Sequence, residues 1–351
     1  MVAIEPPARL DGADGRGSAT IATIADEVGV SVTTVSKVLN GRSDVAPGTR
    51  ARVEASLERH RYRRRPRRQP TRTQQLDLVF HELDTAWSIE IIRGVEAVSA
   101  AAQVDVVLSQ LGGEHRPSQQ WLDRVLARPT LGVLFVLCHP TQSQRRQLQR
   151  QRIPFVVVDT DSATSASVPT VGSNNWNGGL IAVRHLLELG HRRIAIISGP
   201  ADVLCSQARV AGFRSAHDEA GIQVDPDLVR YGAFAAQTGH EHGMALLARA
   251  DRPTAIFAGS DMQAIGVLRA ARQHGLDVPG ELSVIGYDNL SMAAWTGPGL
   301  TTVNQPLRDM AGIATRMLLD LAHGADLVTT RIDLVTELVV RESTAPPPHG
   351  A

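Results

Sequence analysis

The stretch Gly29–Asn40, GVSVTTVSKVLN, has the pattern of a tight turn followed by a short amphipathic helix. The residues before it, Thr20–Val28, place apolar side chains at the i, i+3, i+4 and i+7 positions of another helix. Gly29 supplies the positive φ that ends the first helix, and Ser31 is a favoured N-cap for the second. The sequence therefore predicts two helices joined by a turn of a few residues, a helix-turn-helix.

The polar side of the second helix is expected to face away from the core and, in a helix-turn-helix, to enter the major groove of DNA. Lys37 can donate hydrogen bonds to guanine, and Val32 or Thr33 can contact a thymine methyl group. The candidates for phosphate contacts are Ser31, Ser36, Asn40 and Arg50. A third helix is expected from Pro47 to about His60. Short turns between amphipathic helices also occur in proteins that never bind DNA, so the pattern alone leaves that alternative open.

Charge is distributed unevenly along the chain. Residues 1–75 hold 14 Lys and Arg against 8 Asp and Glu, whereas the remainder holds 22 against 28. A basic segment on an acidic body is expected when only one end of a protein meets phosphate. Pro66 and Pro70 oppose a regular helix after the head, so the segment is either a solvated linker or a contact to phosphates or a narrow minor groove. We define the basic arm as Arg64, Arg65, Arg67 and Arg68.

From Leu76 onward, short apolar runs alternate with helical patterns, as in LDLVF at 76–80 and PFVVVD at 154–159. Apolar strands alternating with helices indicate parallel sheets that are covered on both faces. There are too many such units for one comfortable sheet, so we expect two. Ligands bind such sheets at the carboxyl ends of the strands, and two facing sheets would therefore form a cleft.

The head sequence TIATIADEVGVSVTTVSKVLNG resembles the DNA-binding head of the LacI/GalR (lactose/galactose repressor) family. Later motifs resemble the same family and the periplasmic sugar-binding proteins, including NNxxGG at 174–179, ARVAGF at 208–213 and GLDVPGELSVIGYDN at 275–289. This resemblance implies an α/β protein with an all-α helix-turn-helix head and two doubly wound parallel-sheet subdomains of the periplasmic-binding-protein type. It also implies a homodimer or a higher oligomer, and a near-palindromic operator in double-stranded DNA.

These patterns divide the chain into segments. The expected segments are a disordered extension (1–17), the helix-turn-helix head (18–62), a basic linker (63–75), an effector-binding and dimerisation domain (76–344) and a tail (345–351). Within the large domain, subdomain one is expected at about 76–172 and 291–324, and subdomain two at about 173–290 and 325–344. The resemblance implies that the chain crosses between the subdomains near Ser173, near Leu290 and after Gly324.

Loops after the expected strands carry the candidate effector-binding residues. Asp159, Asp261 and Asp288 could accept hydrogen bonds from sugar hydroxyls, although each could instead cap a helix or stabilise a turn. The resemblance assigns effector contacts above all to Arg209 and Asp288, and Asn174 stands where the family often has Asp. Aromatic residues in loops suit the apolar face of a sugar ring, although each could instead pack in a core; they are Trp87, Phe234 and Trp295.

No catalytic motif is present in the sequence: there is no GxSxG, P-loop, HExxH or Cys/His cluster. We therefore expect no enzymatic activity, no cofactor and no metal. Cys138 and Cys205 lack metal or redox spacing and fit a reducing cytoplasm. The N-terminus lacks the pattern of a signal peptide, and no apolar run approaches the ~20 residues that a membrane span needs.

The sequence thus predicts a cytoplasmic, sugar-responsive transcriptional repressor. Three alternatives remain open: a sugar-binding transport receptor, a carbohydrate enzyme and an architectural DNA-binding protein without an effector. The segment FHELDTAWSIEIIRGVE at 80–96 resembles regulators of plant-polysaccharide sugar uptake, which favours a pentose or a xylan-derived sugar.

Overall fold

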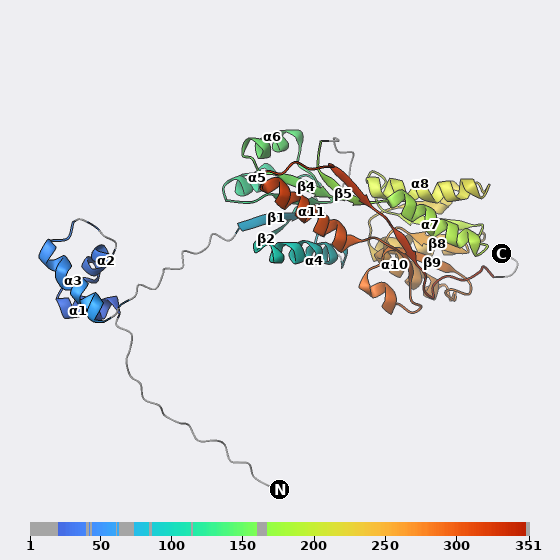
Figure 1. Ribbon diagram of the computed structural model, residues 1–351. Coiled ribbons are helices and arrows are strands. Elements are labelled where there is room, and N and C mark those ends of the chain that lie inside the picture. Colours follow the sequence, from blue (N-terminus) through green and yellow to red (C-terminus); the bar gives the residue numbers. More distant parts are fainter. Residues whose placement is uncertain are drawn as a thin grey trace, which may run out of the picture. The chain divides into compact units, whose positions relative to one another are not determined.

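The chain forms two units, residues 1–72 and 73–351 (Figure 1). The computed structural model describes residues 20–39, 42, 44–60, 62, 74–83, 86–113, 115–159 and 167–348. The predicted extension at 1–17, Asn40 and the basic arm lie outside these described residues.

The predicted helix-turn-helix is confirmed in the first unit. Its helices are α1 (Ile21–Val28), α2 (Val32–Leu39) and α3 (Pro47–Arg59). Thr20 caps α1, and Gly29 ends it in the left-handed conformation at φ 68°. The Ser31 hydroxyl accepts a hydrogen bond from the Thr34 backbone N–H at 3.1 Å at the start of α2. The three helices bury one apolar cluster, made by Ile24, Ala25, Val28, Val35, Val38 and Val53.

The second unit contains two six-stranded sheets among its described residues. The first sheet is parallel throughout, in the order β11-β5-β4-β3-β1-β2. Its strands are β1 (Gln74–Phe80), β2 (Val104–Gln110), β3 (Val133–Val136), β4 (Phe155–Val158), β5 (Thr170–Ser173) and β11 (Arg331–Leu334). Helices α4 (Ala86–Ala101) and α11 (Leu307–Ala322) pack on one face, and α5 (Gln119–Leu126) and α6 (Gln142–Arg150) pack on the other.

The second sheet has the order β12-β10-β9-β8-β6-β7, in which only the pairing of β12 with β10 is antiparallel among the described strands. Its strands are β6 (Ile194–Ser198), β7 (Val229–Tyr231), β8 (Ala255–Ala258), β9 (Ser283–Asp288), β10 (Thr301–Asn304) and β12 (Glu337–Val339). Helices α7 (Asn175–Glu188) and α8 (Leu204–Glu219) cover one face, and α9 (Ala236–Leu247) and α10 (Asp261–Gln273) cover the other (Figure 1). Strand β8 (AIFA) and most of β6 (IAIIS) are apolar because both of their faces are covered.

The first connection between the sheets lies where it was expected, near Ser173, and the other two differ from the expected crossings. The first follows β5, which ends at Ser173. The second lies at Gln305 rather than near Leu290, because β10 still pairs with β9 in the second sheet. Residues 291–304 therefore belong with subdomain two. The third lies between β11 and β12, so β11, which was expected in subdomain two, belongs with the first sheet, because it pairs with β5. The expected crossings came from the resemblance, and the composition of a short strand such as β10 does not tell which strand it joins.

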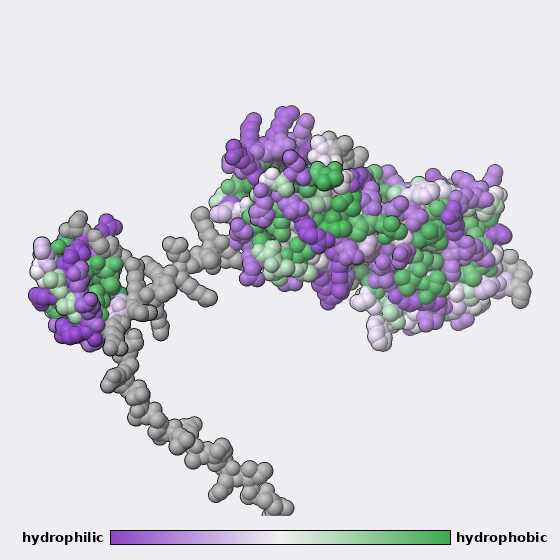
Figure 2. Space-filling view, in the orientation of Figure 1, coloured by the Kyte–Doolittle hydropathy of each residue, from purple (hydrophilic) through white to green (hydrophobic). Residues whose placement is uncertain are grey.

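The surface of the second unit is mixed in polarity. In the face seen in Figure 2, the most continuous hydrophilic cover lies over α6, whose sequence is QSQRRQLQR. Within the described ranges, none of the helices combines the length and the apolar character that crossing a membrane requires.

Candidate functional site

The candidate DNA-reading face is the solvent side of α2. Val35 and Val38 are buried against the other two helices, whereas Val32, Thr33 and Lys37 are exposed. At 100° per residue Thr33 and Lys37 fall on the side opposite the buried pair, and Val32 lies on the flank between them. The arrangement therefore presents an ammonium group, a hydroxyl group and methyl groups, which are the groups needed to contact base edges.

Two of the predicted DNA-contacting cations are engaged within the head. The Lys37 ammonium donates to the Asp44 carboxylate at 2.8 Å. The Arg50 guanidinium donates to the Arg42 carbonyl and lies 3.9 Å from the Glu54 carboxylate. These contacts connect the segment after α2 to both α2 and α3.

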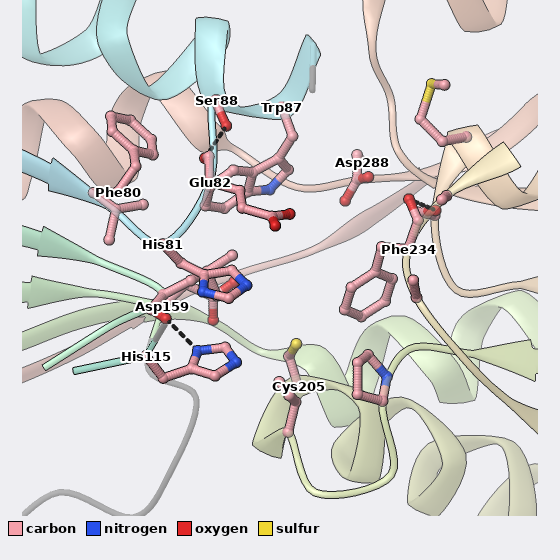
Figure 3. A pocket seen from close by; sticks show the side chains of 18 of the residues that line it. Phe80, His81, Glu82, Trp87, Ser88, His115, Asp159, Cys205, Phe234 and Asp288 are labelled. Carbon is pink, nitrogen blue, oxygen red and sulfur yellow. Dashed lines mark hydrogen bonds between the residues drawn. The ribbon is translucent and has the colours of Figure 1, made fainter. Parts of the chain in front are cut away.

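A cavity of about 260 Å³ lies between the two sheets of the second unit (Figure 3). Its walls come from loops at the carboxyl ends of β1, β2, β3 and β4 on one side and of β6, β7, β8 and β9 on the other. This is the location expected for a ligand site in parallel α/β sheets. Five of the eight predicted effector residues line it: Trp87, Asp159, Arg209, Phe234 and Asp288.

Arg209 is held on α8 by contacts within the protein. Its Nε donates to the Asn175 side chain at 2.9 Å, and a terminal nitrogen donates to the Gly259 carbonyl. The guanidinium carbon lies 3.6 Å from the centre of the Tyr287 ring. The backbone of α8 approaches α7 closely at this point, since a Cβ atom on Gly179 would clash with the Arg209 carbonyl oxygen. The NNxxGG motif therefore fixes the position of the arginine.

Buried carboxyl groups surround this cation. Burial raises the pKa of Asp288 well above its usual value, although the charge of Arg209 acts in the opposite direction. Burial also raises the pKa of Asp159, again against the charge of Arg209. The pKa of Asp261, which adds negative charge near Asp288, rises to about 7 through burial. Burial therefore opposes charge on these carboxyl groups, and the cavity favours a neutral ligand that can both donate and accept hydrogen bonds.

The other three predicted effector residues lie outside the cavity wall. Asp261, the first residue of α10, accepts from the Thr302 hydroxyl at 2.6 Å and from the Leu290 backbone N–H at 2.7 Å. Asn174 caps α7 by accepting a backbone hydrogen bond in its first turn. Trp295 lies in the 3-10 helix Ser291–Trp295, and its side chain is 88% exposed. Asp261 and Asn174 thus have structural roles, and that of Asp261 differs from the helix cap considered from the sequence, because Ser260 is the N-cap of α10.

Gln305 is a buried residue of the site that sequence reasoning missed. Its amide nitrogen donates to the Ser173 hydroxyl at 3.0 Å and to the Asp159 carboxylate at 3.3 Å. Its amide oxygen accepts from the Trp87 indole at 3.4 Å. Gln305 therefore joins two cavity residues to the first and second connections between the sheets. Its place after β10 could have indicated it, had the strand's partner been known.

Two histidines of the cavity wall were also missed. The rings of His81 and His115 stack at a centroid distance of 3.9 Å and an interplanar angle of 5° (Figure 3). His115 Nδ1 donates to the Leu137 carbonyl at 2.9 Å. His81 directly follows β1, so the rule that identified Asp159 after β4 would have found it.

Cys205 lines the same cavity, and burial raises the pKa of its thiol to about 12. The protonated thiol is a poor nucleophile, so Cys205 contributes a packing surface. Among the residues that the structure describes, no cluster of three or more His, Cys, Asp or Glu side chains is arranged to hold a metal ion.

Known proteins match both units. Residues 20–65 match the model of bacterial regulatory proteins of the lacI family, and residues 183–344 match that of the periplasmic binding protein-like domain. The HTH-type transcriptional repressor PurR of Klebsiella pneumoniae (strain 342) is 33% identical over 334 residues, which are 94% of this chain and 98% of that protein. Catabolite control protein A of Priestia megaterium is 29% identical over 329 residues, 93% and 99% of the two chains.

Solved structures agree with these relatives. A complex of the transcriptional regulator CelR with cellobiose has a TM-score of 0.71 at 32% identity, covering 93% of this chain and 99% of that one. The lac repressor dimer bound to operator and the anti-inducer ONPF has a TM-score of 0.67 at 26% identity, covering 94% and 100%. Head and body are thus matched together in single chains. This chain therefore belongs to the LacI family of bacterial regulatory proteins.

Proposed function

We propose that this LacI-family repressor binds its operator through the head and releases it when a neutral sugar occupies the cavity. The observation that carries the proposal is the composition of one cavity, in which Trp87 and Phe234 accompany Asp159, Arg209 and Asp288. Sugars present an apolar C–H face that stacks on aromatic rings and an edge of hydroxyl groups that pair with carboxylates and guanidinium. As a DNA-binding regulator, the protein would act in the cytoplasm.

The charge of the cavity supports a neutral ligand. An anionic ligand, such as a sugar phosphate, would add negative charge beside Asp159 and Asp288. Arg209 already donates to Asn175 and Gly259, so only part of its donor capacity remains for a ligand. A polyhydroxyl ligand can donate to the carboxylates and accept from the remaining guanidinium N–H groups, which satisfies both kinds of buried group.

The cavity constrains the charge of the sugar more narrowly than its size. The similar structure of CelR was solved with cellobiose, which favours a β-linked disaccharide. The expectation from the sequence is a pentose or a xylan-derived sugar. All of these are neutral polyols and agree with the charge argument, so a binding panel should contain each class.

We further propose the contacts of the head with DNA. Val32, Thr33 and Lys37 would meet base edges in the major groove. The residues that would contact phosphates are Ser31, Ser36, Asn40, Arg50 and the basic arm. Two heads related by the two-fold axis of a homodimer would then require a near-palindromic operator.

The connections between the sheets would couple occupancy of the cavity to the relative position of the two subdomains. Gln305 lies at the second connection and contacts Trp87 and Asp159, so a ligand on either side chain would act on the connection as well. A ligand that prefers the closed arrangement of the two sheets shifts that equilibrium by its differential affinity. Moving a balance from 1:99 to 99:1 takes about 5.5 kcal/mol, which a well-packed sugar can supply. A sugar that instead preferred the arrangement of the sheets that binds DNA would act as a co-repressor.

Isothermal titration calorimetry of the full-length protein tests the ligand class. The panel contains pentoses, hexoses, β-linked disaccharides and the corresponding sugar phosphates. We expect saturable binding of one neutral sugar, loss of that binding in Phe234→Ala, and unchanged binding in Trp295→Ala, whose side chain lies outside the cavity. Preferential binding of a sugar phosphate, or equal binding by the two variants, would refute the assignment of the cavity.

A further inference from the structure

The reading face of the head carries a carboxylate. Lys37 projects from the solvent side of α2, opposite the buried Val35 and Val38. The Asp44 carboxylate, from the segment between α2 and α3, accepts from the Lys37 ammonium at 2.8 Å, and the two side chains remain 58% and 45% exposed. Because the ammonium lies on the reading face, the carboxylate that binds it lies there too.

A carboxylate at this place has an electrostatic consequence. DNA is a dense array of negative phosphates, and a carboxylate on the face that approaches it opposes binding unless it is paired. The hydrogen bond from Lys37 holds the pKa of Asp44 below its usual value, so the carboxylate keeps its charge at neutral pH. Lys37, the only lysine in the sequence, is therefore partly neutralised before any DNA arrives.

We propose that Asp44 is a specificity-determining residue, which positions Lys37 for a base edge and cancels its charge toward non-operator DNA. This inference rests on the proposed contact between the head and its operator. An ammonium group has three N–H donors. With one donor on Asp44, Lys37 keeps two for the O6 and N7 atoms of a guanine.

Operator DNA and non-operator DNA then affect the ion pair of Lys37 and Asp44 differently. On an operator, the guanine meets an ammonium group whose long, flexible side chain is already restrained, so less entropy is lost on binding. On other sequences, Lys37 could only serve as a positive charge for a phosphate. To do so it must leave Asp44, and the exposed carboxylate then repels the same phosphates. Asp44 therefore weakens non-specific binding more than operator binding.

Asp44→Asn in the full-length protein tests this inference. Fluorescence anisotropy would measure binding to an operator duplex and to a scrambled duplex across a range of salt concentrations. On scrambled DNA, we expect tighter binding and a log–log salt dependence steeper by about one unit, since each neutralised phosphate contributes ~0.9. The ratio of operator to scrambled affinity should fall about fivefold or more, the lower end of what one base contact supplies. Asp44→Glu should restore most of this ratio.

Two comparisons distinguish the positioning of Lys37 by Asp44 from an effect of net charge or from damage to the fold of the head. Asp26→Asn makes the same charge change at an exposed residue of α1, and it should leave the affinity ratio nearly unchanged. In a Lys37→Ala background, Asp44→Asn should no longer alter discrimination at the base pair that Lys37 contacts. Equal effects of Asp44→Asn and Asp26→Asn, or weaker binding of Asp44→Asn to both duplexes, would overturn the inference. If the unsubstituted protein shows no preference for any operator, the proposed function itself fails.

Discussion

Replacing Arg209 by Met would remove a buried cation from beside Asp159 and Asp288. Methionine preserves an unbranched apolar stem, so the main loss is the guanidinium group and not the packing of α8. Arg209 is only 3% exposed, and its bonds to Asn175 and Gly259 are screened little by solvent. Removing a buried cation from beside ionised carboxyl groups costs about 3–5 kcal/mol, because their charge is then left uncompensated. We expect a loss of unfolding free energy in this range near neutral pH.

The loss of unfolding free energy in Arg209→Met should increase with pH. Burial raises the pKa values of Asp288 and Asp159, and Arg209 opposes that rise. Without Arg209 both pKa values should rise further. A carboxyl group whose folded-state pKa exceeds its unfolded value destabilises the protein increasingly as the pH rises through the interval between the two values. The deficit of Arg209→Met should therefore be large at about pH 8 and smaller at about pH 5, where the carboxyl groups take up protons.

Urea unfolding followed by circular dichroism would measure this difference. Arg214→Met is the matched control on the same helix, because Arg214 is exposed, and it should change the free energy of unfolding by less than about 0.5 kcal/mol. The double variant Arg209→Met with Asp288→Asn should recover part of the loss, because it removes one uncompensated charge. A loss that is the same at both pH values and is not relieved by Asp288→Asn would refute this account of the cavity charges.

Three further predictions concern ligand and DNA. Trp87→Ala should weaken binding of the sugar, measured by calorimetry, by about 1 kcal/mol or more, because the stacking contact is lost. An effect no larger than that of Trp295→Ala would contradict the proposed contact. Lys37→Ala should cost ~1–3 kcal/mol at one symmetric base position in an operator mutation scan, whereas a uniform loss across sequences would indicate a phosphate contact. Changing the basic arm to Ala should reduce the log–log salt slope by roughly 3–4 units in anisotropy titrations. An unchanged slope would exclude its contact with phosphates.

Local features of the fold could be predicted from the sequence because each depends on nearby residues. Gly29 ends α1 and Pro47 begins α3, and both signals act within one turn of helix. The partners of short strands could not be predicted in this way. Strands β10 and β11 are four residues each, and nothing in their composition distinguishes one sheet from the other. The second and third connections were therefore misplaced.

The residues of the candidate site also divide into those with a local sequence signal and those that depend on tertiary contacts. Asp159 and Asp288 were found because they end strands, where parallel sheets bind ligands. Asp261 satisfied the same local rule, yet its carboxylate is used by Thr302 and Leu290, which only the tertiary structure brings to it. Gln305 and the stacked pair of His81 and His115 depend on contacts between distant segments, and periodicity carries no information about them.

The proposed function requires that occupancy of the cavity controls affinity for DNA. Fluorescence anisotropy of a labelled duplex from upstream of this protein's own gene, titrated with the full-length protein in the presence and absence of the sugar identified by calorimetry, tests it most directly. We predict tight, salt-sensitive binding that this sugar weakens in the unsubstituted protein but not in Phe234→Ala. Operator binding that is indifferent to a sugar known to occupy the cavity would contradict the claim.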